Sequence, residues 1–266
     1  MKEYYVLRAT AGLIVAEISM IAPDTSWKEI TDAIHANGGK VFVQLYHTGR
    51  VTHPVMNNGV IPLAPTAIAI DDVIHTPEGK LPFPTPQELN QNQIDDIVQQ
   101  FVTASVNSVE LAGFDGVDIN AGNAFLIDQF LRDVRTNSLV VVNALSDATG
   151  SDRVAVHIAP LSGYNGNYDS DPAAYAAFIA TLLNEFNLAF VFLLRHDLKG
   201  IMVFTKAEAV DALDNDEFGA IALGEPFVAN PDLVIRFERD IDLNEPDRST
   251  IYTQGYEGYL DYPTLD

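Results

Sequence analysis

The chain of 266 residues is long enough for one large α/β domain, and its 47% hydrophobic content predicts a substantial core rather than disorder. Fifteen Lys and Arg against 37 Asp and Glu give a formal net charge of -22, which disfavours nucleic acid and anionic membranes as partners. The absence of cysteine excludes disulfides, thiolate metal sites and a cysteine nucleophile.

The N-terminal stretch shows neither a secretory signal nor a membrane span. It has no basic region followed by an apolar core, and no apolar run in the chain approaches the roughly 18 residues that a spanning helix needs. We therefore expect a cytoplasmic chain. None of the six histidines has a spacing to carboxylates that is typical of a metal site, so we expect no metal. A homo-oligomer is left open.

Seven apolar runs of strand length alternate with helical patterns. The runs span residues 11–22, 39–47, 116–120, 154–159, 188–195, 200–205 and 218–225. Helices are predicted from 26, after 205, from 171 to about 184, and with an apolar face from 94 to 109. Buried strands separated by helices imply a parallel sheet, and their number favours an α/β, (β/α)8 TIM-barrel-like fold over an open sheet. We expect one barrel domain over 1–266.

A stretch rich in Pro and Gly interrupts this alternation at about 52–86. It is long and contains short alternating pieces, which is typical of an excursion with a hairpin rather than of a linker. Farther along, the strand ending at Asn120 is followed by small residues, by Asn123 and Phe125, and by a new helix start. In α/β proteins the carboxyl ends of strands present side chains to a ligand, so we expect this segment to face one.

Several stretches together resemble the old yellow enzyme family of FMN-dependent NAD(P)H oxidoreductases, the ene reductases. They are YYVLRATAGLIVAE, GGKVFVQLYHTGRVTHP, AGFDGVDINAGNAFLIDQFLRD, GEPFVANPDL and LNEPDRSTIYTQGYEGYLDYP, and they cover nearly the whole chain. The resemblance implies a barrel with FMN across the carboxyl ends of its strands. This chain begins after the family's first strand, and the segments between 21 and 27 and between 135 and 140 are shorter than in the family, so we expect a missing strand and shortened loops.

The resemblance also implies catalytic positions. The family pairs His with Asn or His to hold the substrate's carbonyl oxygen, followed two residues later by a proton-donating Tyr; the positions here are Asn120, Asn123 and Phe125. Two amides can still donate hydrogen bonds to a carbonyl or phenolate. Phe125 cannot donate a proton, and removing a general acid costs roughly 10²–10⁴-fold in rate. Ordinary packing is the alternative role for Phe125.

The cofactor contacts match the family only in part. By resemblance, Gln44 contacts the flavin, while Tyr46, His47 and Arg50 line the substrate side in register with the family. His157 stands where the family has an arginine beside the flavin's pyrimidine edge.

The family's Gly-Arg-Pro-Phe phosphate motif is Gly224-Glu225-Pro226-Phe227 here. A carboxylate repels a phosphate, and the glycine-rich phosphate loop is absent. We therefore predict that FMN binding is weak or lost, and that NAD(P)H is used only if FMN is retained.

Three functions follow as hypotheses. The first is a barrel with a degraded FMN site that binds an enone, quinone or phenol-like small molecule and catalyses a redox-neutral isomerisation or cyclisation. The second is an FMN-dependent NAD(P)H ene reductase that acts on activated alkenes. The third is a binding or structural protein without turnover.

Overall fold

The computed structural model describes most of the chain as two compact units. The described residues are 1–17, 26–132, 140–166, 168–194, 196–197, 200–201, 204–251, 253 and 255–265. The first unit holds those within 1–14, 25–41 and 202–266, and the second holds those within 15–24 and 42–201. Each unit is described by itself, and the single domain over 1–266 stays a prediction.

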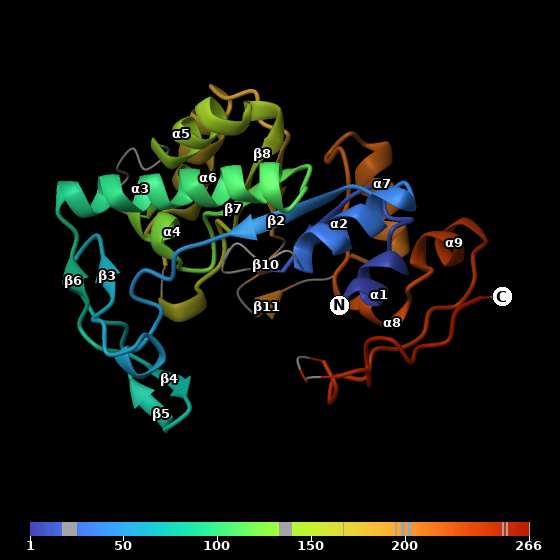
Figure 1. Cartoon of the computed structure of the whole chain (residues 1–266), viewed down its shortest axis with the longest axis horizontal. Coiled ribbons are helices and arrows are strands. Elements are labelled where there is room, and N and C mark those ends of the chain that lie inside the picture. Colours follow the sequence, from blue (N-terminus) through green and yellow to red (C-terminus); the bar gives the residue numbers. More distant parts are fainter. Residues whose placement is uncertain are drawn as a thin grey trace. The chain divides into compact units, whose positions relative to one another are not determined.

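A five-stranded sheet forms the centre of the second unit (Figure 1). In sheet order its strands are β1 (Ile14–Ala16), β2 (Val41–Leu45), β7 (Gly116–Asn120), β8 (Val154–Ile158) and β9 (Phe190–Leu193). From β2 to β9 all neighbouring pairs are parallel. Every residue of β7 and β8 is buried, as expected for parallel strands that are covered on both faces. The predicted α/β class is confirmed.

Helices provide the crossovers between these parallel strands. They are α3 (Gln91–Val106), which continues into the π-helix η2 (Asn107–Leu111), then α4 (Leu126–Leu131), α5 (Val140–Thr149) and α6 (Pro172–Leu183), with short 3-10 turns η3 (Ser151–Arg153) and η4 (Tyr164–Gly166). Asn90 and Gln93 form a reciprocal capping box at the start of α3, and Asp171 accepts the Ala174 N–H at the start of α6. Both helices confirm the sequence prediction.

One glycine allows close aromatic packing inside this sheet. A Cβ at Gly116 would lie 2.3 Å from the Phe42 ring and 2.4 Å from the Arg153 carbonyl oxygen, so no larger residue fits. The Phe42 ring also contacts Phe190, with 5.2 Å between the ring centroids. Aromatic contacts therefore tie β2 to β9 across β7 and β8.

The excursion predicted at 52–86 is present in the second unit. It contains η1 (Pro54–Met56), β3 (Leu63–Ala64), β6 (Gln87–Glu88), and the antiparallel hairpin of β4 (Val73–Thr76) and β5 (Gly79–Pro82). β3 and β6 pair in parallel where the excursion leaves and rejoins the chain. Figure 1 shows the β4–β5 hairpin away from the helices of this unit, which confirms an excursion with a hairpin.

The first unit is helical in its described residues. It contains α1 (Lys2–Val6), α2 (Ser26–Ala36), α7 (Lys206–Asp214), α8 (Glu225–Ala229) and α9 (Leu233–Glu238). α2 begins where the capping-box spacing predicts. Thr205 and Glu208 form the predicted capping box at α7, because each side chain accepts a hydrogen bond from the backbone N–H of the other residue.

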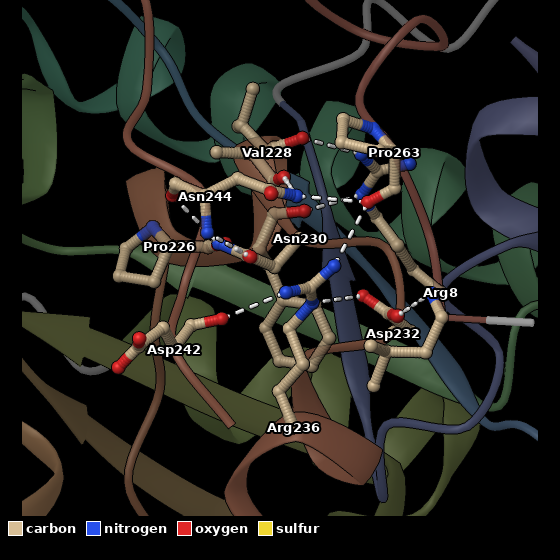
Figure 2. A network of polar contacts seen from close by, with 12 residues as sticks. Arg8, Pro226, Val228, Asn230, Asp232, Arg236, Asp242, Asn244 and Pro263 are labelled. Carbon is tan, nitrogen blue, oxygen red and sulfur yellow. Dashed lines mark hydrogen bonds and ion pairs between the residues drawn. The ribbon is translucent and has the colours of Figure 1, made fainter. Parts of the chain in front are cut away.

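A polar network holds the C-terminal segment in this unit (Figure 2). Arg236 pairs with Asp232 at 2.8 Å and donates to the carbonyl oxygens of Asp242 and Pro263. The other Asp232 oxygen accepts the Leu265 N–H at 2.6 Å. Burial alone would raise the pKa of Asp232, but these hydrogen bonds outweigh it and lower the pKa.

Arg8 connects the N-terminal helix to the same region. It donates to the carbonyl oxygens of Phe227 and Val228, both at 2.8 Å, and of Tyr259 at 3.2 Å. Its guanidinium also lies over the Tyr4 ring, 3.7 Å from the centroid. Backbone carbonyls from three segments thus share one buried cation, which orders them relative to one another.

Two of the seven predicted strands differ in the structure. The run at 218–225 contains no strand, and its residues are mostly exposed, so this prediction was wrong. An apolar run becomes a strand only if a neighbouring strand accepts its hydrogen bonds, which the run alone does not reveal. The run at 200–205 contributes only β11 (Gly200–Ile201), which pairs with β10 (His196–Asp197) in an antiparallel arrangement. The run at 11–22 contains β1, and its residues 18–22 lie outside the described part.

Candidate functional site

Three of the predicted site residues meet at the carboxyl ends of adjacent strands. Gln44 on β2 is the register partner of Asp118 on β7, and Asn120 on β7 is the partner of His157 on β8. Because the strands are parallel, their carboxyl ends lie at one edge of the sheet. The structure therefore brings Gln44, Asn120 and His157 together, as the resemblance implies.

A buried carboxylate determines how the Gln44 amide is oriented. Gln44 Nε2 donates to Asp118 Oδ2 at 2.7 Å, and Gln44 Oε1 accepts from Asn120 Nδ2 at 2.9 Å. The carboxylate of Asp118 only accepts hydrogen bonds, so the nitrogen of Gln44 must face it. Asp118 is fully buried. The sequence analysis assigned Asp118 no role, and the structure places it at the centre of this network.

The same arrangement sets the tautomer of His157. Gln44 Nε2 lies 3.3 Å from His157 Nδ1, and since Nε2 is a donor, Nδ1 accepts. The hydrogen of the neutral ring is then on Nε2. This buried Nε2 and Asp118 Oδ1 have no hydrogen-bond partner within the described part of the chain. A buried polar atom without a partner is costly, so both atoms point to a ligand with matching polar groups.

Phe192 supports the histidine from the neighbouring strand. The His157 and Phe192 rings are stacked with 4.6 Å between centroids and 16° between planes. Stacking restricts rotation of the imidazole, so the direction of its Nε2–H is held from the side opposite to the hydrogen-bonded Nδ1. Phe192 was not predicted as a site residue; its position on a strand paired with β8 is the signal that could have found it.

The two predicted amide donors differ in their surroundings. Asn120 is 2% exposed, and its Oδ1 accepts the Gly122 N–H at 3.0 Å. One hydrogen of its Nδ2 goes to Gln44, which leaves one for a ligand. Asn123 is half-buried and has a left-handed backbone with φ of 57°. Asn120 is thus rigidly held, whereas the position of Asn123 depends on its loop.

Two aromatic residues form a pair beside these amides along the chain. The rings of Tyr46 and Phe125 meet edge to face, with 4.8 Å between centroids and 65° between planes. Both side chains are half-buried. The contact joins the segment after β2 to the segment after β7, and it confirms that these two predicted residues lie together. Phe125 has no ionisable hydrogen, so the pair offers one hydroxyl, that of Tyr46.

His47 and Arg50 lie in the loop after β2. His47 Nδ1 accepts the Gly49 N–H at 3.0 Å, and its carbonyl oxygen accepts the Leu126 N–H at 2.9 Å. Burial lowers the pKa of His47, which favours the neutral ring. Arg50 donates to the Ile68 carbonyl oxygen at 3.2 Å, which ties it to the excursion, and burial lowers its pKa as well. Their role in substrate binding stays a prediction.

Gly224 and Glu225 belong to the first unit. Gly224 is the N-cap of α8 and Glu225 is its first residue. The Glu225 carboxylate accepts a hydrogen bond from Arg248 at 3.1 Å, with side chains 35% and 79% exposed. The negative charge at residue 225 therefore has a cationic neighbour that the sequence analysis did not foresee. No cluster of His, Asp and Glu that could hold a metal occurs within the described residues.

A buried group on α4 was also absent from the predicted site. Asp128 pairs with Arg132 at 2.8 Å and accepts from the Tyr175 hydroxyl at 3.1 Å. Burial, followed by the charge of Asp128, raises the pKa of Tyr175 far above its usual value. Charged residues inside the apolar stretch LIDQFLRD are the signal that could have revealed this group. Among the described residues, no helix is long and apolar enough to cross a membrane.

Comparison with known proteins adds to this geometry. Residues 24–139 match the model of the NADH:flavin oxidoreductase / NADH oxidase family. A curated relative from Leishmania infantum, a probable flavin mononucleotide-dependent alkene reductase, is 32% identical, with 100% of this chain and 88% of the relative covered. The alignment spans 323 positions, more than the chain has residues, which supports the predicted internal shortening.

Two further similarities extend over the whole chain. The 12-oxophytodienoate reductase 7 of Oryza sativa subsp. japonica is 31% identical over 99% of this chain and 85% of its own length. The solved old yellow enzyme from Trypanosoma cruzi is 31% identical and superposes with a TM-score of 0.91 over 100% of this chain and 89% of that one. The likeness confirms the predicted barrel-type fold.

Proposed function

This chain belongs to the NADH:flavin oxidoreductase / NADH oxidase family, that of the old yellow enzymes, and on that premise we propose that it is an FMN-dependent reductase of activated alkenes. The sequence analysis ranked this function second. Relatives named alkene reductase and 12-oxophytodienoate reductase support it better than a flavin-independent isomerase or cyclase.

The unpartnered Nε2 of His157 is the observation that carries the proposal. It is a buried N–H that needs an acceptor, and Asp118 Oδ1 is a buried acceptor that needs a donor. The pyrimidine part of a flavin carries carbonyl oxygens and an N–H, so its chemistry fits both atoms. We propose that His157 and Gln44 hold this part of FMN, with Gly224 and Glu225 toward its phosphate as the resemblance implies.

When bound, FMN supplies hydride transfer from NAD(P)H to the alkene. The residues of this chain prepare the substrate. Asn120 and Asn123 donate hydrogen bonds to the carbonyl oxygen that is conjugated with the alkene, which stabilises the negative charge that develops there. Asn120 uses its remaining Nδ2 hydrogen, since the other is bound to Gln44. Tyr46 and Phe125 provide a flat apolar surface for the substrate.

Phe125 makes this site slow in its last step. The reduced substrate needs a proton at carbon, and Phe125 has none to give, so the proton comes from water. General acid catalysis contributes typically 10²–10⁴-fold, and this factor is missing at residue 125. We also propose that FMN binds more weakly than in relatives, because the arginines expected at positions 157 and 225 are replaced by histidine and glutamate.

Reconstitution with FMN tests the proposal. The protein is titrated with FMN by fluorescence quenching and then assayed for NADH-dependent reduction of 2-cyclohexenone. His157→Phe keeps the ring stacking but loses the Nε2–H, so we expect about five- to ten-fold weaker FMN binding from one lost hydrogen bond. His75→Phe, in the exposed hairpin strand β4, is the control and should leave the affinity unchanged. Absence of FMN binding by the unmodified chain would refute the proposal.

A second function is favoured by Phe125 itself. Without a proton donor at this position, the amide pair polarises a carbonyl but does not complete a fast reduction. This suits the binding of an enone, quinone or phenol, with or without a redox-neutral isomerisation or cyclisation. A thermal shift with these compounds in the absence of FMN would support this function, because a specific ligand stabilises the folded state. No shift with any of them, together with no FMN binding, would leave a protein without turnover.

A further inference from the structure

The loop between β7 and α4 adopts a conformation that its residues disfavour. Asn123 and Ala124 follow one another with φ of 57° and 65°, both in the left-handed region. Alanine rarely adopts this conformation, because its Cβ approaches the following carbonyl oxygen. Ala124 is 1% exposed, so the conformation is not a feature of a free surface loop. Something in the surrounding structure must hold the loop this way.

Two consecutive side chains of α4 hold both peptide groups of Ala124. Asp128 Oδ2 accepts the Ala124 N–H at 2.8 Å. Gln129 Nε2 donates to the Ala124 carbonyl oxygen at 2.6 Å. Asp128 and Gln129 are both buried. The N-cap of α4, Phe125, makes no side-chain cap bond, so these two residues stabilise the turn in place of a cap.

Each of these side chains is itself held in position. Asp128 is oriented by Arg132 and by the Tyr175 hydroxyl. Gln129 also contacts the loop after β2, where Nε2 lies 3.3 Å from the Thr48 carbonyl oxygen and Oε1 accepts the Arg50 N–H at 3.4 Å. One amide therefore bridges two loops that each carry predicted ligand-facing residues.

A glycine makes this bridge sterically possible. Gly49 has φ of 59°, and a Cβ on it would lie 2.3 Å from Gln129 Nε2. Any larger residue at 49 would displace the Gln129 amide. The close approach indicates that the loop after β2 is shaped around Gln129.

We propose that Asp128 and Gln129 are positioning residues, which fix Asn123 and Phe125 over the ligand by holding Ala124 in its left-handed conformation. Gln129 in addition sets the position of the Thr48–Arg50 loop relative to them. This inference rests on the proposed function only in that it takes Asn123 and Phe125 as ligand contacts. Neither Asp128 nor Gln129 contacts the ligand.

The test combines Gln129→Leu with Ala124→Gly. Gln129→Leu removes the hydrogen bonds at similar volume, and should speed hydrogen exchange of the 121–126 amides and weaken binding of the probe 4-nitrophenol about five-fold, as one lost hydrogen bond predicts. Glycine adopts positive φ without strain, so Ala124→Gly in the Gln129→Leu background should restore most of the probe affinity. Gln100→Leu, at an exposed position on α3, is the matched control and should change neither measurement.

Gly49→Ala provides a second variant if Gln129→Leu does not fold. Its new methyl group displaces the Gln129 amide, so loop exchange and probe binding should change in the same direction as in Gln129→Leu. Unchanged loop exchange in both variants, or lost probe affinity that Ala124→Gly does not restore, would overturn the proposal. If the unmodified chain does not bind the probe, the proposed function is weakened, but the exchange rates still decide whether the loop is held by Gln129.

Discussion

Arg236→Met tests whether the polar network of Figure 2 stabilises the first unit. The substitution removes the guanidinium and keeps most of the apolar length. Asp232 is then left mostly buried, with the Leu265 N–H as its remaining strong partner, while the carbonyl oxygens of Asp242 and Pro263 lose a donor. The C-terminal segment loses an anchor at two points.

The expected loss follows from burial. The Arg236 and Asp232 side chains are 7% and 9% exposed, and breaking a buried pair by removing one partner costs about 3–5 kcal/mol. For a chain of this size that corresponds to a fall in Tm of about 10 °C. Lys28→Met is the matched control, because Lys28 and Asp32 are also four residues apart on a helix of the same unit but are 48% and 59% exposed. It should cost no more than about 0.5 kcal/mol.

Urea denaturation at pH 7, followed by circular dichroism, measures both losses. Because the pKa of Asp232 is lowered in the folded protein, its contribution to stability is present above the unfolded pKa of about 3.9 and is lost as pH falls through the folded value. The difference between the unmodified protein and Arg236→Met should therefore narrow below about pH 4. Equal losses for Arg236→Met and Lys28→Met would refute the reasoning, as would a loss below about 1 kcal/mol for Arg236→Met.

Three further predictions concern the site. Phe125→Tyr should raise the rate of alkene reduction by about 100-fold or more by supplying a proton, with Phe218→Tyr as the unaffected control; an unchanged rate would show that proton transfer does not limit turnover. Glu225→Arg should raise FMN affinity at least about ten-fold in fluorescence quenching, and no change would mean that the shortened loops dominate. Burial lowers the pKa of His47, so the unfolded state binds more protons just below about pH 6.5 and stability falls as pH drops. His47→Asn should therefore lose less stability between pH 7 and 5 in urea denaturation than the unmodified protein.

Local signals predicted the helices well. The capping boxes at Thr205 and Asn90, the Asp171-Pro172 start and the apolar spacing of α3 involve residues that are close along the chain, so their effect does not depend on distant partners. The buried strands β2, β7 and β8 were also found from their apolar runs. The run at 218–225 has the same composition without forming a strand, because a strand requires hydrogen bonds to another segment.

The positions of Gln44, Asn120 and His157 could be expected from the sequence, but their chemistry could not. Each ends a strand, and parallel strands bring their ends to one edge. Which nitrogen of His157 carries the hydrogen depends on the Gln44 amide, which in turn depends on a carboxylate 74 residues away in sequence. Such partners follow from strand register, which no local pattern records.

The sequence by itself determined the family, the α/β class, the helix starts and the residue types at the strand ends, because these depend on composition and on spacing along the chain. Only the tertiary structure decided that Asp118 orients Gln44, that Gln129 bridges two loops through Gly49, and that Arg248 lies beside Glu225. Hydrogen bonds and ion pairs act over a few ångströms, so their partners are settled by which distant segments fold side by side.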